Sequence, residues 1–429
     1  MRLFRELGAV VEKRWRKQNY NEDLFSEIAA RALHESDLIA KLDPWEIIRW
    51  VHTTTDLPQQ QDRNAKFGNP PITLYAGSRF YIDVYYWLDG TTAIHQHSFS
   101  GAFQVLLGGS VHSHYRFEKE REISPYLLIG KLHLQDVSLL TKGDIKEIRP
   151  GPQFIHSLFH LERPSATITV RTGNAPHAPV QYSYLKPHLA FDPFFEEDSL
   201  TKKIQTVSLL LSMKHPEADR FIVDLLDDAD FHTTFSVLDV AFGFLGNNEL
   251  EELFQLSKST QRFDVMLEHA RQRHGEIVDL LPPVFEEQRR QADITKRRAM
   301  IQGEDHRFFM ALLLNVAERE TVLSLIKQKF PESDPAELAT TWIKELAAIK
   351  IFGSPEPNVL GLKDFDSTHL AVLAGLLRGL PEAVIETQTI AQLSTQLPFA
   401  EVVKGIKASS LFRSILAAPV VTSDCSHDS

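Results

Sequence analysis

The stretch IHQHSFSGAF, from Ile94 to Phe103, places two histidines two residues apart. Side chains at positions i and i+2 of a β-strand face the same side and lie about 7 Å apart, so His95 and His97 could clamp one metal ion. An isolated pair is weak evidence, because solvated strand histidines are common. Downstream, the segment GDIKEIRPGPQFIHSLFHL combines a Gly-Asp turn, a strand, a Pro-Gly turn and a further histidine, His156. Together the two segments predict a site with three histidine ligands.

The two segments also resemble the paired motifs of the cupin superfamily. The first motif, G-x-n-H-x-H-x-n-G, is matched by Gly90, His95, His97 and Gly108 or Gly109. The second motif is matched by Gly143, Pro150 and His156. The resemblance covers about residues 70 to 185 and implies a small antiparallel β-barrel that holds a metal ion. It carries no information about the remaining helical sequence.

Many cupins add a glutamate shortly after the second histidine, but residues 98–102 of this chain read SFSGA. A set of three histidines resembles the cysteine dioxygenase-type thiol dioxygenases, in which an Fe(II) ion activates O2 beside a bound thiol. The resemblance implies Fe(II), with zinc, nickel and manganese left open. Three neutral imidazoles leave the ion its full charge and open positions for an anionic substrate and O2.

The chain departs from that family downstream of the third histidine, where thiol dioxygenases carry a Ser-x-His-x-Tyr segment. The same count from His156 reaches Thr169, Arg171 and Gly173, and the position of the family's crosslinking cysteine falls on Ala102. The family's acid–base and hydrogen-bonding groups are therefore missing, and we expect a different substrate.

The candidate catalytic residues are Arg171 and His160. A guanidinium facing the barrel binds a substrate carboxylate or phosphate through two parallel hydrogen bonds. A protein carboxylate is the alternative partner of Arg171, because an unpaired guanidinium inside a barrel is costly. Arg79 and Arg116, on neighbouring predicted strands, compete for the substrate role. His160 follows His156 by four residues, which favours a supporting role behind the metal ligands.

Two further patterns leave alternatives open. His112 and His114 form a second H-x-H pair, which is an alternative metal pair, a pocket lining, or a solvated or hydrogen-bonded strand face. In RFYIDVYYWLD, the side chains of Tyr81, Asp83 and Tyr85 share one face of the predicted strand. That polar face contacts substrate if it points into a barrel, and water if it points outward.

The elements that must position these residues follow from hydrophobic periodicity. Residues 1 to about 58 have helical spacing, and Asp43 and Pro44 form a cap and first turn. The polar stretch 56–71 is expected to be a surface connection. Short β-branched and aromatic runs from 73 to about 184 indicate an antiparallel sandwich or small barrel. Apolar residues then recur at three- and four-residue intervals to about residue 418.

We therefore expect an α+β fold: an antiparallel β-barrel of the cupin or jelly-roll type with a short N-terminal helical segment and a large C-terminal all-α domain. The expected domains are a helical segment over 1–69, the barrel over 70–190, a helical domain over 195–418 and a disordered tail over 419–429.

Composition narrows the class of protein. A formal net charge of −11 argues against a general nucleic-acid binder, which needs a basic surface. The single cysteine, Cys425, excludes an intramolecular disulfide and suits a reducing compartment. The longest apolar runs are about half the ~20 residues that span a bilayer, so we expect no membrane association and a cytoplasmic location. A homo-oligomer is compatible with these features.

Two functions fit these observations. The first is a non-haem Fe(II)-dependent oxygenase acting with O2 on a small, anionic, metal-coordinating substrate. The second is a metal- or ligand-binding sensor whose helical domain binds a protein partner. The same scaffold hosts both classes of function, so fold alone does not separate them.

Overall fold

The computed structural model describes residues 1–63, 68–88, 93–173, 178–245, 258–351, 358–362, 365–393 and 399–416. The chain divides into two compact units, Met1–Asp136 with Leu140–Ala292, and Val137–Leu139 with Asp293–Ser429. The motif glycine Gly90, Cys425 and the expected tail 419–429 lie outside the described residues.

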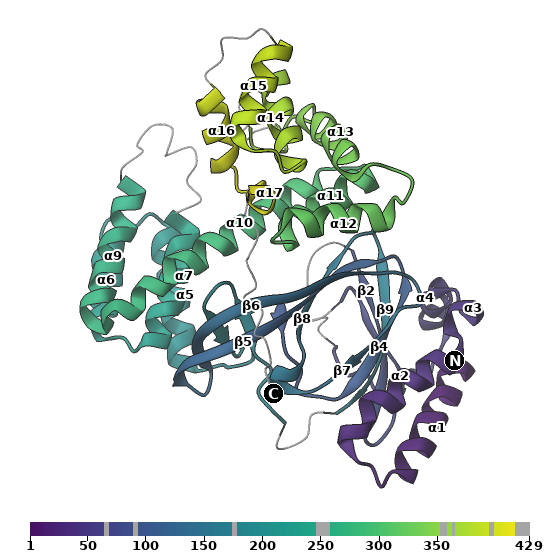
Figure 1. The fold of residues 1–429 in the computed structure, drawn as a ribbon. Helices are drawn as coiled ribbons and strands as arrows, with labels where there is room; N and C mark the ends of the chain where they lie inside the picture. Colours follow the sequence, from purple (N-terminus) through teal and green to yellow (C-terminus); the bar gives the residue numbers. More distant parts are fainter. Residues whose placement is uncertain are drawn as a thin grey trace, which may run out of the picture. The chain divides into compact units, whose positions relative to one another are not determined.

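The first unit begins with helices that cover one face of a sheet (Figure 1). They are α1 (Arg2–Lys17), α2 (Phe25–Ser36), α3 (Leu38–Lys41) and α4 (Pro44–Thr53), with a 3-10 turn, η1 (Glu22–Leu24), before α2. The predicted start of α4 is confirmed, because the Asp43 side chain accepts a hydrogen bond from the Trp45 backbone N–H and Pro44 lies in the first turn. The apolar faces of these helices bury Phe4, Phe25 and Ile47.

The sheet under these helices has five antiparallel strands in the order β1–β2–β9–β4–β7. Their bounds are β1 (Pro71–Ala76), β2 (Phe80–Trp87), β4 (Gly101–Leu107), β7 (Ile145–Ile148) and β9 (Ser165–Thr172). On β2, Ile82 and Val84 pack against the helices, so the alternate side chains, Asp83 and Tyr85 among them, point to the side of the sheet away from the helices. The polar face of β2 therefore lies opposite the helices.

The remaining strands pair in a closed ring in the order β10–β11–β6–β5–β8–β3. Their bounds are β3 (Ile94–His95), β5 (Ser110–Ser124), β6 (Leu127–Leu140), β8 (Ile155–His160), β10 (Ser183–Leu185) and β11 (Leu189–Phe191). A 3-10 turn, η2 (Gly151–Gln153), precedes β8. The expected fold class is confirmed: an antiparallel barrel follows a helical segment and precedes a large helical region (Figure 1).

Further helices complete the first unit. They are α5 (Asp198–Ser212), α6 (Ala218–Asp228), α7 (Phe231–Leu245) and α9 (Lys258–His274), followed by η3 (Gly275–Leu280) and α10 (Leu281–Ala299), in which the unit boundary falls. Their buried side chains share one hydrophobic core with Leu127 and Ile129 of β6 and Leu189 of β11. The helices are thus packed directly on the barrel and are not tethered to it by a linker.

The described helices of the second unit run from α11 to α17. They are α11 (Glu304–Asn315), α12 (Arg319–Lys329), α13 (Pro335–Ala347), α14 (Ser367–Leu377), α15 (Glu382–Leu393), α16 (Phe399–Ala408) and α17 (Arg413–Leu416). The stretch Asp305–Phe330 has apolar residues at helical spacing, but its helix is interrupted after Asn315, whose side chain donates back to the Ala311 carbonyl, and Val316 is extended. Among the described residues, no helix is long and apolar enough to cross a membrane.

Candidate metal centre

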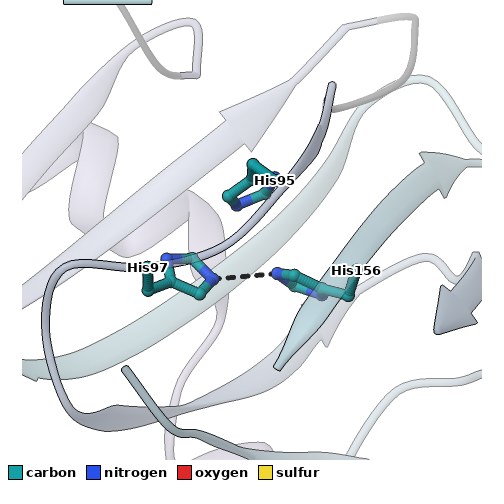
Figure 2. Close-up of side chains that lie close together, drawn as sticks. All are labelled: His95, His97 and His156. Carbon is teal, nitrogen blue, oxygen red and sulfur yellow. Dashed lines mark hydrogen bonds between the residues drawn. The ribbon is translucent and has the colours of Figure 1, made fainter. Parts of the chain in front are cut away.

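Three histidines from neighbouring segments converge in the barrel (Figure 2). His95 on β3 is the register partner of His156 on β8. His97 follows two residues later and forms an isolated bridge with Pro150. Their ligand nitrogens all lie within 4.8 Å of one another, and the Nε2 atoms of His97 and His156 are 2.9 Å apart. The structure thus brings the three predicted ligands together.

A turn of unusual backbone geometry lies in the second motif segment and forms a hydrogen bond to the first. The Gly151 N–H donates to the His97 carbonyl at 2.8 Å, and Gly151 has a φ of +72°, a conformation that L side chains rarely adopt. The Pro-Gly pair read from the sequence therefore has a structural role. The turn at this pair holds the chain close to His97 just before strand β8, which carries His156.

Burial keeps the three imidazoles neutral. His95, His97 and His156 have exposed fractions of 8%, 8% and 2%. Desolvation lowers the pKa of His95. Desolvation, together with the neighbouring imidazoles, holds the pKa of His97 and of His156 well below its usual range. Neutral imidazole is the form that ligates metals, so the site is ready to bind an ion at neutral pH.

The three side chains fit a divalent transition metal. His95 Nδ1 contacts the Ala93 carbonyl at 2.7 Å, so Nε2 is the nitrogen that would bind an ion. Two nitrogens that each bond one ion at about 2.1 Å would lie roughly 3 to 3.5 Å apart, close to the 2.9 Å between His97 and His156. Among the described residues, the ligand cluster contains these histidines and no carboxylate.

A fourth histidine lies directly behind the cluster. His112 on β5 is fully buried, and its Nε2 lies 3.0 Å from Nδ1 of His156. His114 is half-buried and packs edge-on against the His112 ring, with ring centroids 4.3 Å apart. Of the alternatives for the second H-x-H pair, the hydrogen-bonded one describes His112, which contacts the candidate ligand His156.

The histidines line a cavity of about 660 Å³ inside the first unit, a volume suited to a small organic molecule. Its aromatic side chains are Tyr85, Trp87, Phe99, Phe103 and Phe194. Its polar side chains include Thr167, Thr169, Arg171, Gln181 and those of the segment Gln59–Arg63. The wall thus combines aromatic surface with charged, amide and hydroxyl groups that can form hydrogen bonds.

The segment Gln59–Arg63 was expected to be a surface connection, and it also forms part of the cavity wall. The Gln60 side chain accepts from the Thr73 N–H at 2.9 Å and donates to the Thr73 carbonyl at 3.1 Å. The Gln61 N–H donates to Thr73 Oγ1 at 3.2 Å. These bonds attach the segment to β1 much as an additional strand would be attached.

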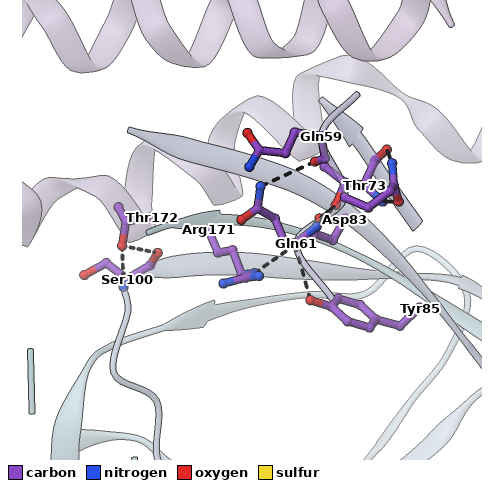
Figure 3. Close-up of polar contacts among 9 residues, drawn as sticks. Gln59, Gln61, Thr73, Asp83, Tyr85, Ser100, Arg171 and Thr172 are labelled. Atoms are coloured by element: carbon purple, nitrogen blue, oxygen red, sulfur yellow. Dashed lines mark hydrogen bonds and ion pairs between the residues drawn. The ribbon is translucent and has the colours of Figure 1, made fainter. Parts of the chain in front are cut away.

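Arg171 faces the cavity but has a protein carboxylate as its partner (Figure 3). Its Nε donates to Asp83 Oδ2 at 2.9 Å, and the side chains of the two residues are 16% and 3% exposed. Asp83 also accepts from Thr73 Oγ1 at 2.7 Å and from the Tyr85 hydroxyl at 3.3 Å. Of the two partners considered for Arg171, the carboxylate is therefore present. Burial, together with the Asp83 charge, raises the pKa of Tyr85, so its phenol stays protonated.

His160 lies at the far end of β8 from His156. Its Nδ1 contacts Ser165 Oγ at 2.7 Å, and its ring stacks on Trp87 with centroids 4.6 Å apart. Trp87 in turn lines the cavity. His160 thus contacts the cavity wall at Trp87. The competing arginines lie elsewhere: Arg79 covers the Tyr20 ring, and Arg116 is 63% exposed beside Glu118.

Comparison with known proteins gives little information about this site beyond its geometry. No protein-family model matches the chain. No curated protein matches it either. Partial matches exist among solved structures, and the three described next have low identity and low TM-scores.

Three of these structures illustrate the range. A protein with a double-stranded β-helix domain from Klebsiella pneumoniae subsp. pneumoniae MGH 78578 is 16% identical and covers 24% of this chain and 75% of its own, with a TM-score of 0.17. Hydroquinone 1,2-dioxygenase from Sphingomonas sp. TTNP3 is 11% identical, covering 25% and 68%, with a TM-score of 0.20. DMSP lyase DddQ from Ruegeria pomeroyi DSS-3 is 14% identical, covering 35% and 95%, with a TM-score of 0.20. At these values the likenesses carry no information on this chain's activity.

Sequence reasoning did not identify three features of the site. His112 contacts a ligand because β5 and β8 pair in a register that the sequence does not reveal. Asp83 reaches Arg171 because β2 pairs with β9. The segment Gln59–Arg63 gave no signal beyond its polarity. For His112 and Asp83, the H-x-H spacing and the alternation along β2 were the available clues.

Proposed function

We propose that the protein is a non-haem oxygenase in which His95, His97 and His156 hold Fe(II) and a small, metal-coordinating substrate reacts with O2. The observation that carries the proposal is a set of three buried, neutral imidazoles, with no carboxylate in the set, at the wall of a cavity. When bound, the iron supplies Lewis acidity toward the substrate and the electrons for O2 chemistry. Zinc, nickel and manganese suit the same ligands and are distinguished by metal analysis.

The charge balance of the site supports a substrate with one anionic heteroatom. Its three proposed ligands are neutral, so they leave a divalent ion with its whole charge. Arg171 is already balanced by Asp83. The anionic group of the substrate is therefore proposed to bind at the metal, and Arg171 to act on the substrate as a hydrogen-bond donor whose charge is compensated.

The remaining wall residues are proposed to orient the substrate and exclude water. Tyr85 keeps its phenol proton and lines the cavity, so it can donate a hydrogen bond to a bound group. Phe99 and Phe103 provide apolar surface near His97 and His156. His160 is proposed to hold the Trp87 ring in place by stacking, without contacting the substrate itself.

A second candidate function is a metal- or ligand-binding sensor whose helices bind a protein partner. The shared hydrophobic core between the barrel strands and helices α5 to α10 favours it, because a ligand in the barrel would act on elements packed against those helices. Tight ligand binding without turnover would distinguish the sensor from the oxygenase.

Metal analysis combined with O2 uptake tests the proposal. We expect the purified chain to bind about one metal ion and the iron-loaded protein to consume O2 only when a substrate is added. His156→Ala should remove the metal, because that residue is one of three proposed ligands. His52→Ala, at an exposed helix position, is the matched control and should leave metal content unchanged.

Full metal occupancy in the His156→Ala protein would exclude the proposed ligand set. A cytoplasmic location and a homo-oligomeric state stay predictions, as does the lack of nucleic-acid and membrane partners. Light scattering of the purified chain measures the oligomeric state directly.

A further inference from the structure

The buried histidine behind the cluster contacts a histidine of the cluster in a way that a contribution to fold stability does not explain. On paired strands β5 and β8, His114 is directly opposite His156, whereas His112 occupies the diagonal position. It is nevertheless His112 whose Nε2 approaches His156 Nδ1, at 3.0 Å. The second H-x-H pair of the sequence thus supplies one ring that contacts a proposed ligand and one ring that packs beside it.

Metal binding would determine the protonation of both rings. His156 must present the lone pair of Nε2 to the ion, so its proton lies on Nδ1. That Nδ1–H then donates to His112 Nε2, which must be an acceptor. The proton of neutral His112 consequently lies on its Nδ1, a buried atom that has no hydrogen-bond partner among the described residues.

This arrangement is unfavourable for folding by itself. A buried donor without a partner is destabilising, and an apolar ring of similar shape would avoid that cost. The other two proposed ligands differ from His156 in the contacts of their Nδ1 atoms. His95 Nδ1 contacts the Ala93 carbonyl, whereas His97 Nδ1 has no hydrogen-bond partner within the described part of the chain. A polar residue that lowers stability at such a position is expected where function requires it.

We infer that His112 is a positioning residue that fixes the tautomer and ring orientation of His156 and thereby raises the affinity of the site for its metal. The inference rests on the metal centre of the proposed function. It does not depend on the identity of the substrate or on turnover.

The experiment measures Co(II) binding to the full-length, metal-free protein and three variants. His112→Phe keeps a ring and removes the acceptor, whereas His112→Gln keeps an acceptor oxygen near the place of Nε2. His114→Phe is the matched control, since His114 contacts His112 and Phe154 by ring packing. Affinity, the visible absorption spectrum of bound Co(II), and the melting temperature of the metal-free protein are recorded for each.

We expect His112→Phe to weaken Co(II) binding about 10- to 100-fold, the usual effect of losing a partner behind a ligand, and to change the Co(II) spectrum. His112→Gln should regain most of the affinity, and His114→Phe should resemble wild type. The metal-free His112→Phe protein should melt no lower than wild type. Equal affinity in the His112→Phe protein would overturn the inference, as would failure of His112→Gln to regain affinity. If wild type itself binds no Co(II), the proposed metal centre fails instead.

Discussion

Among single residues, the Arg171–Asp83 pair has the largest consequence for stability and substrate choice. The two charges lie inside the barrel, where removing one partner leaves the other uncompensated. Thr73 and Tyr85 add hydrogen bonds to the carboxylate, so Asp83 is held from three sides (Figure 3). The pair therefore acts as a fixed, neutral part of the cavity wall.

Asp83→Asn should lower the free energy of unfolding by about 3 kcal/mol, because it leaves the Arg171 guanidinium without its counter-charge. Urea unfolding of the metal-free protein measures this change. Glu217→Gln breaks an exposed ion pair with Arg220 and serves as the control, with an expected change below about 0.5 kcal/mol. The double variant Asp83→Asn/Arg171→Met should lose less than the sum of its single changes, and additive losses would contradict the coupling.

The buried histidines predict acid sensitivity of the metal-free protein. His95, His97, His112 and His156 have folded-state pKa values below the ordinary value of 6.5. Above pH 6.5 both folded and unfolded states are neutral at these residues, whereas below it only the unfolded state takes up protons readily. Stability should therefore be complete above about pH 6.5 and fall as the pH drops below it, by up to about 1.4 kcal/mol per pH unit for each histidine.

Melting temperatures recorded between pH 8 and pH 5 test whether stability falls as the pH is lowered. His112→Phe removes one of the titrating rings, so its melting temperature should depend less steeply on pH than that of wild type. A melting temperature that rises or stays constant as the pH falls through this range would show that the rings are not held neutral.

At the scale of elements, the segment Gln59–Arg63 shows how a polar connection becomes a cavity wall. Gln60 and Gln61 bind Thr73 on β1, while Thr73 also donates to Asp83. One hydroxyl therefore links the segment to the buried ion pair. Asp83 also accepts a hydrogen bond from Tyr85 on the same strand, β2, so these residues of the cavity wall form one hydrogen-bond network.

Thr73→Val keeps the shape of the side chain and removes its hydroxyl. The Gln61 N–H then loses its acceptor, so its protection against amide hydrogen exchange should fall about tenfold, the effect of losing roughly 1 to 1.5 kcal/mol. Hydrogen exchange with mass spectrometry resolves the peptide over residues 58–63. Thr53→Val, in an exposed helix, should leave that peptide unchanged.

For the molecule as a whole, we propose that the cavity selects the substrate, because strands β2, β3, β8 and β9 each contribute side chains to it. Counted from His156, Thr169 and Arg171 stand where the resemblance to thiol dioxygenases implies acid–base and hydrogen-bonding groups, and both line that cavity. Neither is a histidine or tyrosine. The scaffold therefore combines a three-histidine set with a different substrate wall.

The iron-loaded protein should not oxidise cysteine, since the required histidine and tyrosine are missing from this wall. Liquid chromatography of the sulfinic acid product together with O2 uptake measures the reaction. Efficient oxidation of cysteine would contradict this prediction and would show that the Arg171–Asp83–Tyr85 network can replace those groups.

Whether a contact in the site could be predicted depends on how far apart its two residues lie in the sequence. The spacing of His95 and His97 and the turn before His156 are local patterns, because side chains alternate along a strand and Gly151 favours a positive φ. The Asp43 cap of α4 is equally local. Such features follow from chemistry within a few residues, so the sequence by itself determined the three proposed ligands, the start of α4 and the class of fold.

Only the tertiary structure decided which partners meet across the sheets. Arg171 and Asp83 are 88 residues apart, and His112 and His156 are 44 apart. Their contacts depend on strand pairing and register, and a shift of one residue would turn every side chain of a strand to the opposite face. Whether the polar face of β2 met water or the cavity depended likewise on the helices α1 to α4, which cover its other side. Burial of one face by a distant segment is a property of the packed chain, and no local pattern encodes it.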